Sequence, residues 1–254
     1  MSEYLAYTFY DICLILGVYL IAALTKGLTG LGFSTTCLPI LVLIFGLKPT
    51  LPFLIIPSIA SNLLVMSQAG NFKITLNQFW PLYIAQAPGV FLGLLLLIWL
   101  APYISTAILG VALIIYCSFA LSNPEFLIPS HLRNRLALPT GFFTGVINGF
   151  TGSQVMPLLP YMLSLGLSPS HFVQAINCSF TLSSLLMALG LLGLELITLE
   201  IALISIMGII PVYIGTKIGS KTREHLNSAV FRKLVLISLI LMGCVLAGQF
   251  LYNY

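Results

Sequence analysis

Charged residues are scarce in this chain of 254 residues: they make up 6% of it, against about a quarter in a soluble domain. Hydrophobic residues make up 59%, and the mean hydropathy is +1.09. The ten Lys and Arg residues form no basic stripe interleaved with aromatic side chains, so no nucleic-acid partner is expected. The composition predicts an integral membrane protein that is surrounded by the lipid bilayer.

Sequence signals for metal or cofactor chemistry are also lacking. The five cysteines lie in apolar runs without Cys-x-x-Cys or Cys/His spacing, which argues against a disulfide framework and a metal site. Neither a His-Glu-x-x-His motif nor a Gly-rich phosphate loop is present. The first residues lack a basic region, so we expect no cleaved signal peptide. We therefore predict no cofactor, no metal and no enzymatic activity.

Ten apolar segments can be placed along the chain. A helix needs about 20 residues to cross a hydrocarbon core of about 30 Å. Three segments, 31–46, 135–149 and 153–165, look too short for this and are interpreted as half-helices, which either re-enter the membrane or cross it tilted. The sequence predicts an all-α polytopic membrane protein with segments at 9–25, 31–46, 50–69, 78–100, 103–121, 135–149, 153–165, 170–193, 198–216 and 231–252.

Basic residues predict the orientation of these segments, because short cytoplasmic loops are enriched in Lys and Arg. Arg133, Arg135 and the basic group 217–233 fall on one face, and Lys48 is an exception. A polar linker has five segments on either side, and an odd count inverts the second half relative to the first. We predict two inverted repeats in the cytoplasmic membrane, 1–121 and 136–254, joined by a cytoplasmic linker at 122–135.

Each repeat contains a Gly-x-Thr-Gly turn that interrupts an apolar run. The first is Gly27-Leu-Thr-Gly30-Leu-Gly32, followed by Pro39, and the second is Gly149-Phe-Thr-Gly152, followed by Pro157. We interpret each as the tip of a Gly/Pro-broken helical hairpin that opens its repeat. Because the repeats are inverted, the two tips approach each other from opposite faces and meet near the midplane, where inverted-repeat transporters bind substrate.

The chemistry of these turns favours an anion. Helix starts carry unsatisfied N–H groups with about half a positive charge, which suits an anion without a buried Lys or Arg. The alternative is that small polar side chains only pack helices and bond back to carbonyl groups. Lys26 is interpreted as a loop charge at the end of the first segment, with an anion-attracting charge as the alternative. The candidate substrate-binding residues are Thr29, Gly30, Gly32, Ser34, Asn62, Thr151, Gly152, Ser153, Gln154 and Asn177.

Together with the turns Gly46-Leu-Lys-Pro49 and Gly166-Leu-Ser-Pro169, these motifs resemble the TauE/SafE sulfite-exporter family of membrane permeases over nearly the whole chain. The resemblance implies transport of a small sulfur-containing anion, such as sulfite or an organosulfonate like sulfoacetate. The chain departs from the family's Gly-rich turn at Phe33 and at Ser153-Gln154, which leaves the substrate open.

Other functions remain open alongside export. Expelling one negative charge from a negative cytoplasm gains about 2.3 kcal/mol per 100 mV, so export needs no coupling ion. One alternative is a non-transporting accessory subunit that docks a partner. A membrane-embedded enzyme is disfavoured, since acidic residues are absent from the predicted spans apart from Asp11 near the first interface and the loop acids Glu195 and Glu200. The sequence also leaves open whether the chain forms a homo-oligomer.

Overall fold

The computed structural model describes residues 7–29, 32–122, 127–222 and 228–252, and all regular secondary structure in these ranges is helical. Six stretches have the length and apolar composition of membrane spans. The predicted all-helical, membrane-type architecture is therefore confirmed. The helices are α1 (Phe9–Thr29), α2 (Phe33–Phe45), α3 (Leu47–Ala69), α4 (Phe72–Trp99), α5 (Pro102–Ser122), α6 (Ser130–Thr151), α7 (Leu158–Leu163), α8 (Pro169–Gly193), α9 (Leu199–Met207), α10 (Ile209–Thr222) and α11 (Ser228–Tyr252).

Two helices that follow a glycine turn are too short to cross a bilayer upright. α2 has 13 residues and α7 has 6, so their lengths are about 20 Å and about 9 Å against a hydrocarbon core of about 30 Å. α6 has 22 residues, because its helix begins five residues before the apolar run 135–149. The run 135–149 was expected to form a half-helix, but the helix that contains it is longer than that.

The expected segment 198–216 is divided into α9 and α10 at Gly208. Pro211 has no N–H to donate to the carbonyl group of Met207, so the helical hydrogen-bond ladder is interrupted there. The ladder resumes at once, because the N–H of Val212 donates to the carbonyl oxygen of Gly208 at 3.1 Å. The two helices still form one apolar stretch of 24 residues, so the break leaves the number of span candidates unchanged.

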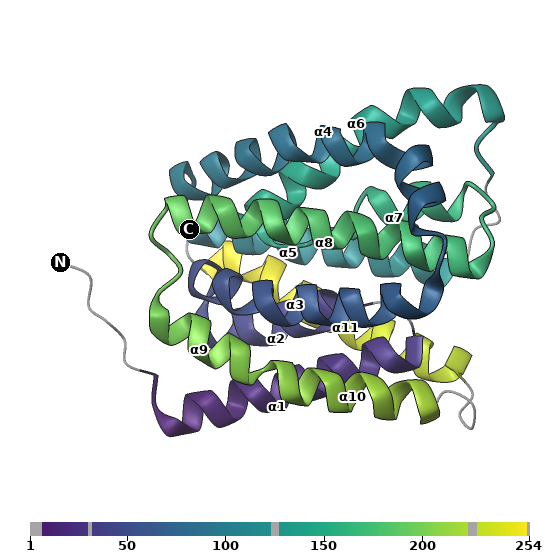
Figure 1. The fold of residues 1–254 in the computed structure, drawn as a ribbon. Coiled ribbons are helices and arrows are strands. Elements are labelled where there is room, and N and C mark those ends of the chain that lie inside the picture. The colour runs from purple at the N-terminus through teal and green to yellow at the C-terminus, as the bar shows by residue number, and fades with distance from the viewer. Residues whose placement is uncertain (1–6, 30–31, 123–126, 223–227, 253–254) are drawn as a thin grey trace.

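The helices pair across the chain as well as with their sequence neighbours. α4 lies along α6 at one edge of the bundle, α1 lies along α10 at the opposite edge, and α3 and α8 run side by side between them (Figure 1). α5 packs against α11. Each of these pairs joins the first half of the chain to the second, so the two halves interlock in a single bundle.

Glycines allow the backbones of the two edge pairs to touch. In the α4–α6 pair, a Cβ atom on Gly93 would lie 2.2 Å from the carbonyl oxygen of Val146, and one on Gly149 would meet the α4 backbone equally closely. In the α1–α10 pair, a Cβ atom on Gly27 would lie 2.4 Å from the carbonyl oxygen of Thr216. Gly27 and Gly149 open the two Gly-x-Thr-Gly motifs, so the first glycine of each motif serves close helix packing.

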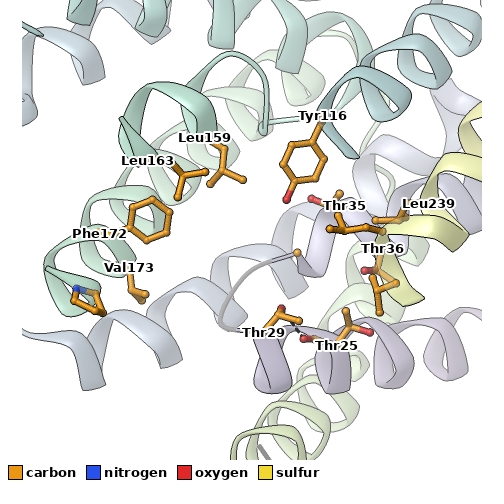
Figure 2. Close-up of a pocket in the computed structure, with 14 residues that line it drawn as sticks. Thr25, Thr29, Thr35, Thr36, Tyr116, Leu159, Leu163, Phe172, Val173 and Leu239 are labelled. Carbon is orange, nitrogen blue, oxygen red and sulfur yellow. Dashed lines mark hydrogen bonds between the residues drawn. The ribbon is translucent and has the colours of Figure 1, made fainter. Parts of the chain in front are cut away.

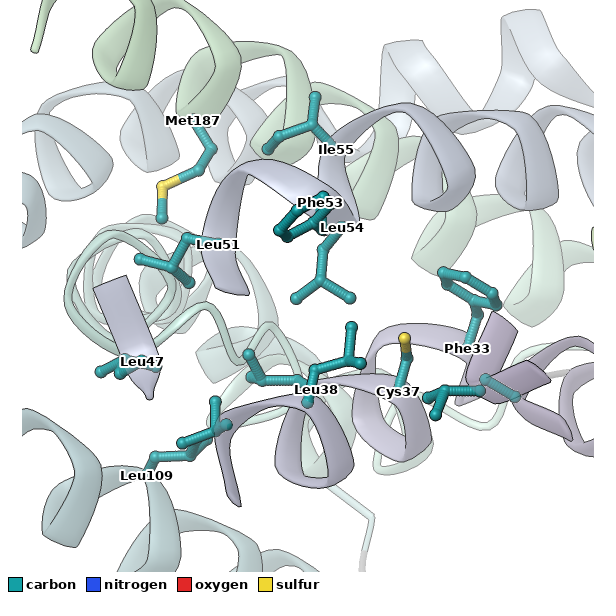
Figure 3. Packing of buried hydrophobic residues seen from close by; sticks show 14 of the residues in the cluster. Phe33, Cys37, Leu38, Leu47, Leu51, Phe53, Leu54, Ile55, Leu109 and Met187 are labelled. Atoms are coloured by element: carbon teal, nitrogen blue, oxygen red, sulfur yellow. The ribbon is translucent and has the colours of Figure 1, made fainter. Parts of the chain in front are cut away.

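A buried apolar cluster fixes the beginning of α2. Phe33 and Leu38 of α2 belong to the same cluster as Phe53 of α3 (Figure 3). The ring of Tyr19, on α1, lies 6.1 Å from the ring of Phe33, and its hydroxyl donates to the carbonyl oxygen of Phe53 at 2.6 Å. Contacts from α1 and α3 therefore hold the first turn of α2, which carries the first polar cluster, in a defined position.

Replacing Gly93 with alanine should destabilise the folded protein by about 1–3 kcal/mol, because the added methyl group overpacks the α4–α6 contact. The melting temperature of the purified protein in detergent measures this loss. Gly17→Ala on α1 is the matched control: nothing lies within 4 Å of a Cβ atom there, and alanine is the better helix former. Equal melting temperatures for the two variants would contradict the proposed role of the glycine contacts.

Candidate functional site

The two glycine turns lie after the C-terminal ends of α1 and α6. Gly152 has a φ of +76° and caps α6 by donating its N–H to the carbonyl oxygen of Asn148 at 2.7 Å. Gly32 has a φ of +99° immediately before α2, and both values favour glycine. Gly30 lies outside the residues that the structure describes. At both turns a left-handed glycine thus separates a long helix from the short helix that follows it.

The threonines of the two turns bond back into their own helices. The Thr29 hydroxyl donates to the carbonyl oxygen of Thr25 at 2.8 Å, and the Thr151 hydroxyl donates to that of Ile147 at 2.7 Å. The Thr151 hydroxyl also accepts the N–H of Ser153 at 3.2 Å. Each hydroxyl thus bonds to a carbonyl group one turn earlier in its own helix, so the structure gives both threonines the backbone-bonding role that was the alternative to substrate contact.

A chain of hydrogen bonds connects the first turn to the second. The hydroxyls of Ser34 and Ser58 lie 3.0 Å apart, and the Ser184 hydroxyl lies 3.5 Å from that of Ser58. The Gln154 amide completes the chain by donating to the Ser184 hydroxyl at 3.1 Å. α2, α3, α8 and the segment after α6 each contribute one member. Ser34 and Gln154, one candidate from each glycine-turn region, are therefore connected through Ser58 and Ser184.

Two small cavities flank this chain of side chains, and Ser34 and Gln154 line both of them. One has a volume of about 20 Å³ and also borders Ser58 and Gly152. The other, of about 10 Å³, borders the first turn of α2 together with Asn62. Each has room for about one water molecule. In this conformation the polar side chains therefore fill the site and leave no room for a ligand larger than water.

Lys26 lies inside α1 and is 2% exposed. Its ammonium group donates to the Ser61 hydroxyl at 3.1 Å and to the side-chain oxygen of Asn62. Lys26 lies in the last turn of α1, where a long basic side chain could extend to the membrane interface; here the side chain is instead buried against α3. The interpretation of Lys26 as a loop charge is wrong, because the helix continues to Thr29 beyond it.

Ser153 and Asn177 are buried but line none of the described cavities. The Ser153 hydroxyl and the side-chain oxygen of Asn177 have no hydrogen-bond partner among the described residues. The Asn177 amide nitrogen donates to the carbonyl oxygen of Val173 at 2.8 Å, within α8. Of the ten candidates, the structure gathers Gly32, Ser34, Asn62, Gly152 and Gln154 around the two small cavities.

A larger cavity of about 230 Å³ lies beside the first turn of α2. Threonines line one wall and apolar side chains line the other, with Tyr116 between them (Figure 2). Thr29 faces this cavity, and Gly32 and Thr35 border both it and the smallest cavity. The first turn of α2 therefore separates this larger cavity from the small cavities around Ser34 and Gln154. The labelled wall residues in Figure 2 are Thr25, Thr29, Thr35, Thr36, Leu159, Leu163, Phe172, Val173 and Leu239.

Four members of the site were not among the candidates from sequence: Ser58, Ser61, Ser184 and Lys26. Ser58 and Ser61 are spaced i and i+3 and precede the predicted Asn62 at i+4, so the three form a polar stripe on one face of α3, and this spacing is a signal that the sequence does contain. Lys26 gives a weaker signal, as a basic residue directly before the first turn. Ser184 gives none, because only the packing of α8 brings it to Gln154.

The family model for the sulfite exporter TauE/SafE matches residues 15–246. No curated protein and no solved structure matches the chain. The family match covers nearly all of the helical bundle, including both glycine turns, and its members are transporters. Its description agrees with a chain that has six helices suited to crossing a membrane. This protein therefore belongs to the sulfite exporter TauE/SafE family.

Proposed function

We propose that this protein exports a small sulfur-containing anion, either sulfite or an organosulfonate such as sulfoacetate, across the cytoplasmic membrane. Membership of the family implies an anion-export permease. The observation that carries the finer proposal is the chain of hydrogen bonds from Ser34 to Gln154. It joins the first turn of α2 to the segment after α6 through buried polar side chains of α3 and α8.

The pairing of helices supports two inverted repeats, 1–121 and 136–254, on either side of the linker 122–135. In this scheme α1 corresponds to α6, α3 to α8, α4 to α9 and α10, and α5 to α11. The pair α1–α10 then maps onto α6–α4, while α3–α8 and α5–α11 each map onto themselves. Such a set of contacts is what a pseudo-two-fold axis in the membrane plane produces.

We propose that each repeat opens with a hairpin made of one long and one short arm. α1 and α6 are the long arms, and α2 and α7, about 20 Å and about 9 Å in length, are the short arms. Short arms of this length end within the membrane, where irregular backbone is tolerated only if protein or a water-filled cavity surrounds it. The substrate site lies where the short arms begin.

The groups at this site suit the oxygen atoms of a sulfur oxyanion. The first turn of α2 presents N–H groups that have no acceptor within the helix, and the helix dipole adds a partial positive charge there. The Ser34 hydroxyl and the Gln154 amide are further donors. Cavities of about 20 Å³ and about 10 Å³ are too small for the anion, so Ser34 and Gln154 must separate when it binds.

The larger cavity supports a path from the cytoplasm to this site. Its walls come from the last turn of α1 and the first turn of α8, at the same ends of the bundle as Lys73 and Arg133. In the predicted orientation these ends are cytoplasmic. An anion entering there meets the first turn of α2 before it reaches Gln154, and the membrane potential favours its onward movement.

Replacing Gln154 with leucine should lower sulfite flux in liposomes by about 10- to 100-fold, since a hydrogen bond to a charged group contributes about 1.5–3 kcal/mol. Gln86→Leu is the matched control: Gln86 is also buried and also donates to a serine of α8, Ser179, but it lines no described cavity. Radiolabelled sulfite and organosulfonates are measured under an imposed potential. Equal flux in the two variants would contradict the site. Flux that appears only with a second protein would favour the accessory-subunit alternative.

Cysteine labelling tests the path and the orientation. In a variant whose native cysteines are replaced by alanine, Thr29→Cys should react with a membrane-impermeant thiol reagent only from the face that carries Lys73 and Arg133, because Thr29 lines the larger cavity. Thr151→Cys should not react from either face, since Thr151 is fully buried. Labelling of position 29 only from the opposite face would contradict a cytoplasmic opening of the larger cavity.

A further inference from the structure

Lys26 is a buried lysine whose hydrogen-bond partners among the described residues carry no charge. Both of its hydrogen-bond acceptors, the Ser61 hydroxyl and the Asn62 side-chain oxygen, are neutral. The sequence contains no Asp or Glu from residue 12 to 124 or from 126 to 194, a range that includes all of α2, α3 and α8. Asp11 lies on α1 itself, but 15 residues away, which is about 22 Å along a helix. Among the residues that the structure describes, the ammonium group is held by hydrogen bonds alone.

The ammonium group lies at the proposed substrate site. Lys26, Asn62 and Gln154 line one cavity together with Gly32, Ser34 and Thr35 at the start of α2. Lysine, the helix start and the glutamine amide are all donors or positive ends of dipoles. The lining of this cavity includes no carboxylate, so Lys26 is the ionisable residue in its wall.

Asn62 adds a second, independent observation. It is 1% exposed, and its amide nitrogen has no hydrogen-bond partner among the described residues. Buried donors without an acceptor are rare in folded proteins and call for an explanation such as an unfilled ligand position. An acceptor placed in this cavity would satisfy the Asn62 nitrogen and the Lys26 ammonium group at the same time.

We propose that Lys26 is the charge-bearing residue of the substrate site, an inference that rests on the proposed export function. Ser61 and Asn62 hold its ammonium group when the site is empty. The incoming anion takes the place of the Asn62 oxygen as the acceptor of Lys26 and accepts a hydrogen bond from the Asn62 nitrogen. An oxyanion with several acceptor atoms meets this demand, and a cation does not. Substrate binding therefore neutralises a charge that the empty protein keeps buried.

Lys26→Met tests this role, with Lys73→Met as the matched control, because Lys73 is exposed and the same charge is lost. The readouts are the melting temperature with and without sulfite, and sulfite flux in liposomes. We expect Lys26→Met to melt no lower than wild type without sulfite, since a buried unpaired charge is removed. We expect it to lose the sulfite-induced rise in melting temperature and at least 30-fold in flux. Lys73→Met should match wild type in both.

Two more variants separate charge from packing. Lys26→Arg keeps the charge and should retain part of the sulfite-induced rise, whereas Lys26→Gln keeps hydrogen-bonding capacity without the charge and should lose it. Lys26→Gln also provides the test if Lys26→Met does not fold. A purely structural lysine predicts lower melting temperatures with flux per folded molecule unchanged, and that result would overturn the inference while leaving the export function standing. If wild type itself shows neither flux nor a sulfite-induced rise, the export function and the inference both fall.

Discussion

The structure depends on one constraint, which is that a polar group inside a hydrocarbon bilayer must find its partner within the protein. The turn threonines meet it by bonding to carbonyl groups one turn earlier in their own helices. Ser34, Ser58, Ser184 and Gln154 meet it by bonding to one another across four segments of the chain. The Asn62 amide nitrogen, beside Lys26, is one of the buried groups that have no partner among the described residues, and an anion bound there would supply an acceptor.

Hydrogen bonds within the protein that stabilise the empty site must be replaced by hydrogen bonds to the anion when the site is filled. The bond from Gln154 to Ser184 and the bond from Lys26 to Asn62 both occupy groups that an oxyanion would otherwise use. Binding and opening are therefore coupled in this account, because the anion can enter only as the internal partners separate. The glycine contacts of α4 with α6 and of α1 with α10 keep the edge pairs closely packed, so we expect the movement to occur at the short arms.

Sequence reasoning predicted those features that depend on local pattern. These features are the all-helical class and the short helices after each glycine turn. Two of the predicted site residues, Ser34 and Gln154, also lie in one chain of hydrogen bonds. The burial of Lys26 was not predicted, because the apolar run was taken to end before the first charged residue. The helix α1 continues past that residue to Thr29. The pairing of Ser58 with Ser184 and the packing role of Gly149 depend on contacts between distant helices. The break at Gly208 had a local cause, Pro211, yet the apolar run continued through it.

The most direct test of the central claim is to locate a bound anion by anomalous scattering, with selenite in place of sulfite in crystals of the purified protein. The account predicts a selenium peak within hydrogen-bonding distance of the Lys26 ammonium group and the first turn of α2. It also predicts that the bond from Gln154 to Ser184 is broken in that structure. A peak confined to the 230 Å³ cavity, with Lys26 still held by Asn62, would contradict the claim that the two glycine turns form the binding site.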